Sequence, residues 1–345
     1  MMNEFFNFLL HNLDLNTIYI IFTDYCYSVI MKTKILLLKQ EISKQVIGHK
    51  EMVDALLIGL FTNGHILLEG VPGLAKTTAV NALSKALNLK FKRVQFTPDL
   101  LPSDIIGAEI YDVKSGDFKI KHGPIFTNLL LADEINRAPA KVQSALLEVM
   151  QERQVTIGDE SFDIDSPFLV LATQNPIEQE GAYPLPEAQL DRFMFKIIVG
   201  YNSEAEEYEI AQKAANDSFE TVNAVLSAKD LHQIKEEVKN IYIDDELQAY
   251  IVQLIFATRE PKKYGLQEIE AYLQFGASPR ATIDMLKAVK ARAYLRGHDS
   301  VSPLDIALSI KDVLRHRIIL SYEAVAEGMD SDTIIQKILE TVPVP

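Results

Sequence analysis

The amino-acid sequence predicts an α/β fold, in which a five-stranded parallel sheet with two β-hairpin insertions is followed by an all-helical domain. Up to about residue 199, short apolar runs alternate with segments of helical periodicity. This alternation is typical of a parallel sheet covered by helices on both faces. From Tyr201 onward the strand signals stop. The sequence therefore predicts an N-terminal extension at 1–30, a core domain at 31–201 and a helical domain at 202–345.

The expected strands and helices of the core follow one another regularly. Each expected strand is a short apolar run bounded by turn or polar residues. These strands are His65–Glu69, Phe91–Phe96, Asn128–Glu134, Phe168–Asn175 and Met194–Val199. Apolar residues three and four positions apart predict the helices, which are Ile35–Val46, Lys50–Phe61, Ala75–Leu87 and Pro139–Gln151.

Two polar segments interrupt this alternation. Residues 110–121 and residues 154–164 each contain two short strand patterns around a glycine-bearing turn. Strand, turn and strand in this order predict β-hairpins. Because both segments are polar, we expect them to project from the sheet without joining its core, and such projections commonly contact partners.

The second part of the chain carries clear helix starts. Ser203 with Glu206 and Ser227 with Asp230 have the spacing of capping boxes. Ser302 before a proline predicts another start. The later helices are expected at 244–258, 279–296, 303–317 and 332–339.

Composition and charge restrict the class of protein. Of the 345 residues, 48% are apolar and 24% are charged, which is ordinary for a soluble globular protein. The formal net charge of -14 and the lack of a Lys/Arg block argue against nonspecific binding of nucleic acid. Cys26 is the only cysteine, which excludes an intrachain disulfide and a cysteine metal cluster, and we expect a reducing, cytoplasmic setting. The histidines show no spacing typical of a metal site.

The first thirty residues differ from the rest of the chain. They are rich in Phe, Tyr, Ile and Leu, but Asp14 and Asp24 interrupt the apolar run, which is too short for a membrane span. The features of a signal peptide are also missing. Met31 followed by Lys-Thr-Lys has the character of a natural start, which indicates that the start at Met1 lies too far upstream. The other interpretation, which we favour, is a partly ordered tail or a helix packed on a neighbour.

The loop after the first expected strand has the layout of a phosphate-binding site, namely a strand, a glycine-bearing loop and a helix start. Backbone N–H groups would converge on the phosphates, Lys76 would neutralise their charge, and the Thr77 hydroxyl would bind magnesium. Ala75 departs from the usual G-x-x-x-x-G-K-[ST] pattern, and we expect it to fit with a negative φ. A plain strand-to-helix turn is the alternative. The nucleotide-binding residues predicted here are Gly70, Val71, Pro72, Gly73, Leu74, Ala75, Lys76, Thr77 and Thr78.

Polar side chains end two further expected strands. Asp133 and Glu134 follow an apolar run, and Asn175 ends the next strand. Because parallel strands bind ligands at their carboxyl ends, we expect Asp133 to hold magnesium, Glu134 to activate the attacking water and Asn175 to orient the γ-phosphate or that water. The alternative is that the two acids only cap the following helix.

Two arginines complete the candidate site. Arg192 precedes the last expected strand and could reach the γ-phosphate of a neighbouring subunit as an arginine finger. Arg280 begins a helix of the second domain and could reach back onto the γ-phosphate of its own subunit. A surface ion pair is the alternative for either one.

Together these motifs resemble those of the AAA+ ATPases, and their amino-acid sequences resemble those of the MoxR family. The matching segments are GVPGLAKT at 70–77, ADEINRAPAKVQSALLEVMQE at 132–152, ATQNP at 172–176, PLPEAQLDRF at 184–193 and GASPRA at 276–281. The resemblance covers most of residues 35–325, and Ala before the lysine is frequent in this family.

The resemblance implies an AAA+ core with a helical lid domain and names the site residues. It implies a Walker A loop, Walker B acids Asp133 and Glu134, sensor-one Asn175, arginine finger Arg192 and sensor-two Arg280. It also implies an adenine pocket at Val46, Ile47 and Gly48. The hairpins match insertions of the clade that includes MoxR, magnesium chelatases and minichromosome-maintenance helicases.

The expected function is a magnesium-dependent ATPase that remodels partner proteins. The resemblance implies ATP and Mg²⁺ as cofactors, a ring that is usually a hexamer, and a partner bearing a von Willebrand factor A domain. Three alternatives stay open: an ATP-gated scaffold with little turnover, a nucleic-acid motor and a chelatase-like subunit. The acidic net charge speaks against the nucleic-acid motor.

Overall fold

The computed structural model describes residues 30–114, 116–176 and 182–345. The predicted extension therefore lies outside the described residues except for Ile30, and so does Ser115 in the turn of the first predicted hairpin. A helical segment at 30–43 begins the described chain.

A five-stranded sheet forms the centre of the core. Its strands are β1 (Ile66–Glu69), β2 (Phe91–Gln95), β5 (Leu129–Asp133), β8 (Leu169–Gln174) and β9 (Phe195–Ile198), in the order β2-β5-β8-β1-β9. All neighbouring pairs are parallel. The predicted sheet is confirmed, and its strand ends differ by only one or two residues. Because the strands are parallel, all their carboxyl ends lie at one edge.

Helices cover both faces of this sheet. Alternate residues of β5 pack into different apolar clusters, with Leu129 and Leu131 in one and Leu130 and Ala132 in the other. Side chains of a strand point alternately to its two faces, so both faces are buried. Helices α3 (Lys50–Thr62) and α4 (Lys76–Ala86) contribute to the first cluster, and α6 (Ala140–Glu152) contributes to the second.

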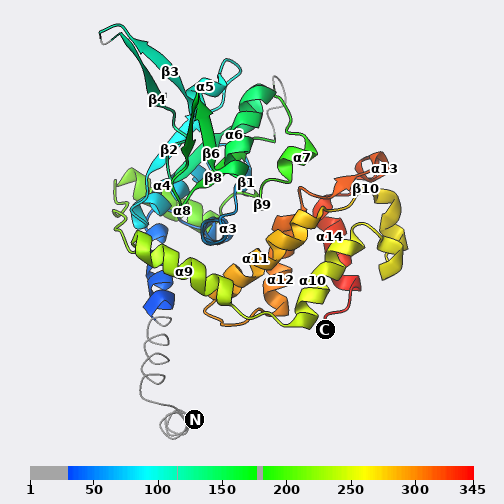
Figure 1. Ribbon diagram of the computed structural model, residues 1–345. Coiled ribbons are helices and arrows are strands. Elements are labelled where there is room, and N and C mark those ends of the chain that lie inside the picture. The colour runs from blue at the N-terminus through cyan, green and yellow to red at the C-terminus, as the bar shows by residue number, and fades with distance from the viewer. Residues whose placement is uncertain (1–29, 115, 177–181) are drawn as a thin grey trace, which may run out of the picture.

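The two predicted hairpins are present, but only the first lies outside the core. Strands β3 (Gly107–Asp112) and β4 (Asp117–His122) follow the short helix α5 (Pro102–Ile106) and project from the core, as Figure 1 shows. Strands β6 (Gln154–Ile157) and β7 (Glu160–Asp163) form the second hairpin. Val155 and Ile157 on its inner face are each only 4% exposed and join the core cluster beside α6. The expectation that both hairpins stay out of the core is therefore wrong for the second one, because its alternating apolar residues are buried.

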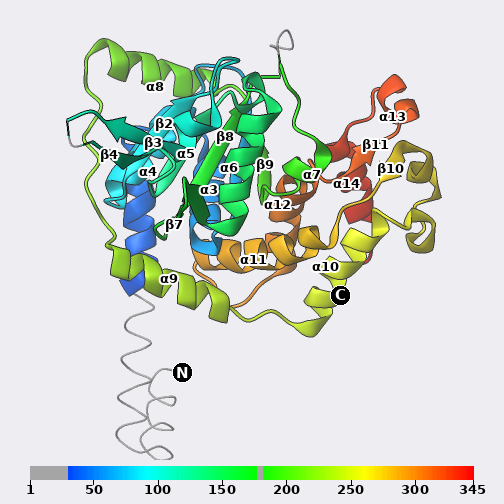
Figure 2. The ribbon, with the colours of Figure 1, turned by 45° about the horizontal axis from the view of Figure 1, so that its top comes forward.

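Two helices after the sheet run along the core. Helix α8 (Glu204–Ala215) begins at the Ser203 capping box, and α9 (Ala228–Asn240) begins at the Ser227 capping box, as predicted. The start of α8 lies against Gly48, because Asn202 and Glu206 are the side chains nearest to that glycine, and Figure 2 shows α9 beneath α3. Helix α9 also packs against α11 (Pro279–Leu295).

The rest of the chain forms a helical bundle beside the core (Figure 1). Besides α11 it contains α10 (Asp245–Ala257), α12 (Pro303–Leu314), α13 (Tyr322–Ala326) and α14 (Ser331–Thr341). We expected no strands after Tyr201, but the structure contains two short ones. Strands β10 (Leu273–Phe275) and β11 (Ile319–Leu320) pair here in an antiparallel ribbon, and they are too short to show an alternating pattern in the sequence. Within the described ranges, no helix is both long and apolar enough to cross a membrane.

Candidate functional site

A cavity of about 350 Å³ lies at the carboxyl edge of the sheet. We call it the carboxyl-edge pocket. The loop between β1 and α4 forms one wall, and the ends of β5 and β8 form the other. The residues that line it are Gly70, Pro72, Gly73, Leu74, Ala75, Lys76, Thr77, Thr78, Arg93, Asp133, Glu134, Thr173 and Asn175. Thus the pocket brings together the predicted loop, both predicted acids and the predicted asparagine.

The loop has a tighter backbone than the sequence suggested. Ala75 has φ +52°, so its expected negative φ is wrong, and Gly73 has φ +89°. A left-handed alanine costs about 1–2 kcal/mol, a cost that glycine would avoid. No side chain caps the start of α4 at Lys76, which leaves its first N–H groups available to an anion. Val71 does not line the pocket and packs against the core instead.

Lys76 points along the loop. Its Nζ donates a hydrogen bond to Gly70 O at 2.7 Å. Burial lowers the pKa of Lys76, while the nearby carboxylates of Asp133 and Glu134 act in the opposite direction. The ammonium group is therefore held between the loop and the acids, where a phosphate group would meet it.

Asp133 is held by two residues that the sequence analysis did not identify. Arg93 of β2 donates from Nε at 3.0 Å and from Nη2 at 2.6 Å to the same oxygen, Oδ2. The Thr173 hydroxyl donates to the other oxygen, Oδ1, at 2.6 Å. Gln95 of β2 lies opposite Asp133 in the sheet, and only this strand pairing places Arg93 near the acid. A polar residue near the carboxyl end of a strand was the one signal that could have indicated Thr173.

Glu134 and Asn175 occupy the same end of the sheet. Glu134 has φ +56°, an uncommon value for this residue type, and its N–H donates to the Thr173 hydroxyl at 2.9 Å. Its Oε2 lies 3.0 Å from Nε of Arg137. Asn175 is 9% exposed and lines the pocket. Strained residues that their surroundings hold in place are frequent at functional sites.

The residues of the pocket fit a magnesium ion. The Thr77 hydroxyl and the Asp133 carboxylate both line it and both offer oxygen ligands, which Mg²⁺ prefers. No group of three or more His, Cys, Asp or Glu side chains in the described ranges is arranged as a metal site. Mg²⁺ usually takes one or two protein ligands and completes its shell with phosphate oxygens and water, and Thr77 and Asp133 could serve as such ligands.

Arg192 and Arg280 lie elsewhere, in a cavity of about 240 Å³ that we call the arginine cavity. His65, just before β1, also lines this cavity, whereas Gly70, just after β1, lines the carboxyl-edge pocket. Five residues of extended chain span about 17 Å, which exceeds the reach of an arginine side chain. This arrangement does not bring Arg280 to the loop of its own subunit, because the helix that carries it packs at the opposite edge of the sheet.

Each arginine donates a hydrogen bond to a backbone carbonyl, and a buried arginine lies behind Arg280. Arg192 Nη1 donates to Leu147 O at 2.9 Å, and Arg280 Nη1 donates to Asp191 O at 3.3 Å. Arg317, whose side chain is 1% exposed, donates from Nε to Asp191 at 2.8 Å and from Nη2 to Asp284 at 2.6 Å. Burial raises the pKa of Asp284, and the Arg317 guanidinium opposes this shift. Arg317 carries no signal in the sequence, because it looks like any other basic residue near a helix end.

The segment expected to contact adenine lies against the start of α8. Val46 and Ile47 are buried, and Gly48 has φ +71°. Asn202 Nδ2 donates to Ile47 O at 3.0 Å. None of these residues lines the carboxyl-edge pocket, so their role in binding adenine stays a prediction.

Comparison with known proteins gives the family. The model of the ATPase family associated with various cellular activities (AAA) matches residues 65–195, and the AAA lid domain model matches residues 267–338. Chaperone MoxR1 of Mycobacterium tuberculosis is 48% identical over 305 residues, which cover 88% of this chain and 81% of the relative. Protein MoxR of Methylorubrum extorquens is 29% identical over 338 residues, which cover 89% and 94% of the two chains.

A solved structure agrees with these matches. The crystal structure of a protein from Cytophaga hutchinsonii, described as a putative ATPase, superposes with a TM-score of 0.90 at 51% identity, covering 94% of this chain and 99% of that one. The predicted fold class and the resemblance are therefore confirmed. The chain belongs to the MoxR family of AAA+ ATPases and is a nucleotide-binding ATPase.

Proposed function

We propose that this ATPase hydrolyses MgATP in the carboxyl-edge pocket and uses the hydrolysis to remodel partner proteins. The single observation that supports the site is the convergence of Lys76, Thr77, Asp133, Glu134 and Asn175 on one pocket. A magnesium ion held by Thr77 and Asp133 would supply neutralisation of the phosphate charge. Glu134 would orient the attacking water and accept its proton, and Asn175 would orient the γ-phosphate.

Both cavity arginines act on a neighbouring subunit in this proposal. Arg192 and Arg280 lie together at the amino edge of the sheet, away from their own loop. In a head-to-tail ring, which we propose is a hexamer, this edge would face the neighbour's carboxyl-edge pocket. Arg192 would then serve as the arginine finger. Arg280 would act beside it on the same phosphate, and this differs from the reach within one subunit that the sequence suggested.

Remodelling of partner proteins is proposed from likeness to relatives. The relative from Mycobacterium tuberculosis carries the name chaperone. The family resemblance adds a partner with a von Willebrand factor A domain. Affinity capture with Glu134→Gln protein held in ATP would test this, because a stalled ring should retain its partner. Recovery of the ring together with such a protein is expected. The proposal would be contradicted if the ring were recovered but no other protein were captured in greater amount with ATP than without ATP.

Glu134→Gln tests the catalytic assignment. We expect turnover to fall by about 100-fold or more, because general-base catalysis contributes about 10²–10⁴ in rate, while ATP binding is retained. Phosphate release measures the first and a fluorescent ATP analogue the second. Glu148→Gln, an exposed change on α6, is the matched control. Unchanged turnover in Glu134→Gln would refute the assignment, and a parent protein with no turnover would favour the ATP-gated scaffold.

Mixing two inactive variants tests the action between subunits. Arg192→Ala subunits keep an intact pocket, and Glu134→Gln subunits keep an intact arginine. If the arginine acts on the neighbour, mixtures should recover hydrolysis at those interfaces where a Glu134→Gln subunit supplies Arg192 to an Arg192→Ala pocket. No recovery at any mixing ratio, in mixtures shown to form mixed rings, would contradict the proposal.

A further inference from the structure

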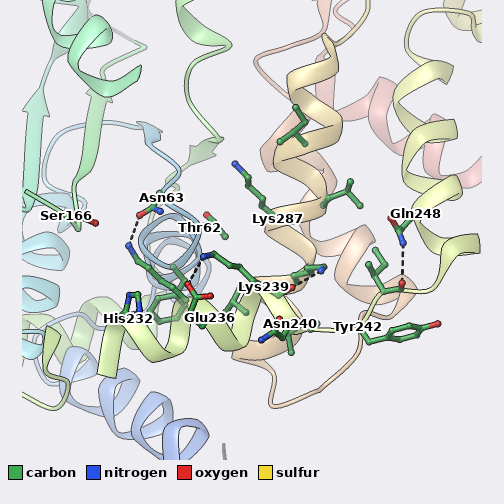
Figure 3. A pocket seen from close by; sticks show the side chains of 18 residues that line it. Thr62, Asn63, Ser166, His232, Glu236, Lys239, Asn240, Tyr242, Gln248 and Lys287 are labelled. Atoms are coloured by element: carbon green, nitrogen blue, oxygen red, sulfur yellow. Dashed lines mark hydrogen bonds and ion pairs between the residues drawn. The ribbon is translucent and has the colours of Figure 1, made fainter. Parts of the chain in front are cut away.

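A large cleft adjoins the arginine cavity. It has a volume of about 930 Å³ and lies between α9, α11 and the C-terminal end of α3. Thr62, Asn63, Ile283 and Lys287 line both hollows, so the two are continuous. Figure 3 shows Lys287 of α11 extending toward Thr62 and Asn63 at the end of α3. We call this hollow the basic cleft.

The basic cleft carries more positive than negative charge. Four lysines line it, and the one acid among the described lining residues, Glu236, pairs with one of them, Lys239. Lys235, Lys287 and Lys290 line the cleft, and none of them forms an ion pair with a carboxylate among the described residues. Lys235 Nζ donates instead to the uncharged Asn63 Oδ1 at 2.6 Å. Burial, followed by the nearby charge of Arg153, lowers the pKa of Lys235 to about 8. In a protein of net charge -14, such a cluster favours an acidic partner.

Helix α8 has the complementary properties. None of its residues is buried, although it is 12 residues long. Glu204 and Glu207 have no ion-pair partner among the described residues, and Tyr201 and Tyr208 are 76% and 66% exposed. A helix of this length is marginally stable alone, and most helices gain their stability by packing one face. An acidic helix that carries exposed Tyr208 and is preceded by exposed Tyr201 therefore fits a surface outside its own subunit.

The two surfaces lie beside the two halves of the proposed shared site. The N–H of Val199 donates to Glu69 O at 2.7 Å, and the Val199 carbonyl lies against Gly70. Helix α8 starts a few residues later, so its start lies on the carboxyl side of the sheet, although none of its residues lines the carboxyl-edge pocket. The basic cleft borders Arg192 and Arg280 at the other edge.

We propose that α8 of one subunit docks into the basic cleft of the next subunit in the ring. The proposal rests on the proposed function, because arginines that reach the neighbour's pocket bring the surfaces beside them face to face. Glu204 and Glu207 then meet the unpaired lysines. The tyrosines cover the apolar part of the cleft, where Ile283 is 54% exposed. The occupant of the cleft is thus a second copy of this chain.

Charge reversal tests this pairing. One variant carries Lys287→Glu and Lys290→Glu in the cleft, and the other carries Glu204→Lys and Glu207→Lys on the helix, both in Glu134→Gln protein held in ATP. Either variant alone presents like charges at every interface, so we expect half-assembly to need about tenfold more protein or greater. An equal mixture can alternate around the ring so that every interface pairs opposite charges. The mixture should therefore assemble like the parent, as measured by sedimentation velocity.

Several results would overturn the proposal. The first is that each variant alone assembles like the parent. The second is that the mixture fails to assemble, although circular dichroism and the melting temperature show that both variants are folded. Neutral Lys287→Gln and Glu207→Gln variants should weaken assembly less than the reversals, and an equal effect would exclude pairing by charge. The assumption of a ring has its own test. If the parent protein stays monomeric in the presence of ATP, both the docking of α8 and the action of the arginines on a neighbouring subunit are refuted. If the mixture of Arg192→Ala and Glu134→Gln subunits recovers hydrolysis, the proposed function holds even if α8 docks elsewhere.

Discussion

The carboxyl-edge pocket and the arginine cavity differ in how the chain builds them. At the carboxyl edge, most residues of the pocket come from one continuous loop and from the ends of two neighbouring strands. At the amino edge, Arg192 and Arg280 come from separate domains of the sequence. Arg280 is linked to buried Arg317 through Asp191, whereas Arg192 donates to Leu147 O. The first site is organised locally. The second depends on how the helical bundle packs against the sheet, so a movement of the bundle would move Arg280 relative to Arg192.

The largest effect is expected when the arginine cavity loses its central ion pairs. Arg317→Met would leave Asp191 and Asp284 without their partner, and removing one member of a buried pair costs about 3–5 kcal/mol. Asp191 and Asp284 are 24% and 15% exposed, so the lower end is expected. Urea unfolding measures the loss. The control is Lys262→Ala, which breaks an exposed pair with Glu270 and should cost less than about 1 kcal/mol. Equal losses in both variants would show that the cavity is not organised by Arg317.

A pH-dependent loss of stability is expected from His65 in the wall of the same cavity. Its Nδ1 accepts the N–H of Val170 at 3.0 Å, so Nε2 carries the proton and donates to Met150 O at 3.1 Å. Burial, with the charge of Arg153, lowers the pKa of His65 to about 3. Below pH 6.5, the ordinary pKa of histidine, the unfolded state therefore binds a proton at His65 that the folded state does not bind until the pH is much lower. Stability is full above that pH and should fall by up to about 1.4 kcal/mol per pH unit below it.

His65→Gln checks the source of this pH dependence. Glutamine can keep an acceptor and a donor at this position but does not titrate. Buried His316, whose pKa also lies well below its ordinary value, adds a loss of the same sign. Unfolding free energies between pH 7.5 and pH 4.5 should therefore show a shallower slope in His65→Gln, though not a flat one. An unchanged slope would remove His65 as a cause.

A smaller effect is expected at the carboxyl edge from Arg93. Its guanidinium binds the Asp133 oxygen Oδ2 and so competes with a metal cation for this carboxylate. Arg93→Ala should lower the Mn²⁺ concentration needed for half-saturation of the ATP complex by about tenfold, equivalent to about 1.4 kcal/mol. Electron paramagnetic resonance of Mn²⁺ in Glu134→Gln protein measures this without turnover. Lys92→Ala, on the same strand, is the control. Weaker metal binding in Arg93→Ala would mean that Arg93 supports the metal site.

The smallest effect is expected in the loop itself. Ala75→Gly removes the cost of a left-handed alanine, which is about 1–2 kcal/mol, but it also gives the unfolded chain more conformational freedom, which opposes this gain. We expect the stability to change by less than about 1 kcal/mol and ATP binding to be retained. Ala75→Val should instead weaken ATP binding, because a β-branched residue at positive φ is strained. Equal ATP affinity in the two variants would show that the loop backbone rearranges on binding.

Local patterns determined much of this protein. The apolar runs around Leu67, Leu130 and Val170 specify buried strands, because strands covered on both faces carry continuous apolar sequence. Parallel strands align their carboxyl ends, and for this reason the residue order alone was enough to group Lys76, Asp133 and Asn175 in one site. Serine capping boxes at Ser203 and Ser227 specify two helix starts for a similarly local reason.

Tertiary structure alone decided the contacts between distant segments. Arg93 reaches Asp133 because β2 lies beside β5 in the sheet. The sequences of the two strands do not specify that they are neighbours. Arg280 lies beside Arg192 because α11 packs at the amino edge of the sheet. Side-chain chemistry and short-range spacing are properties of the sequence, whereas the position of a helical bundle results from many weak packing contacts summed over the whole interface. The sequence thus determined the chemistry of the nucleotide site, and the packing of the bundle decided which edge of the sheet receives the second arginine.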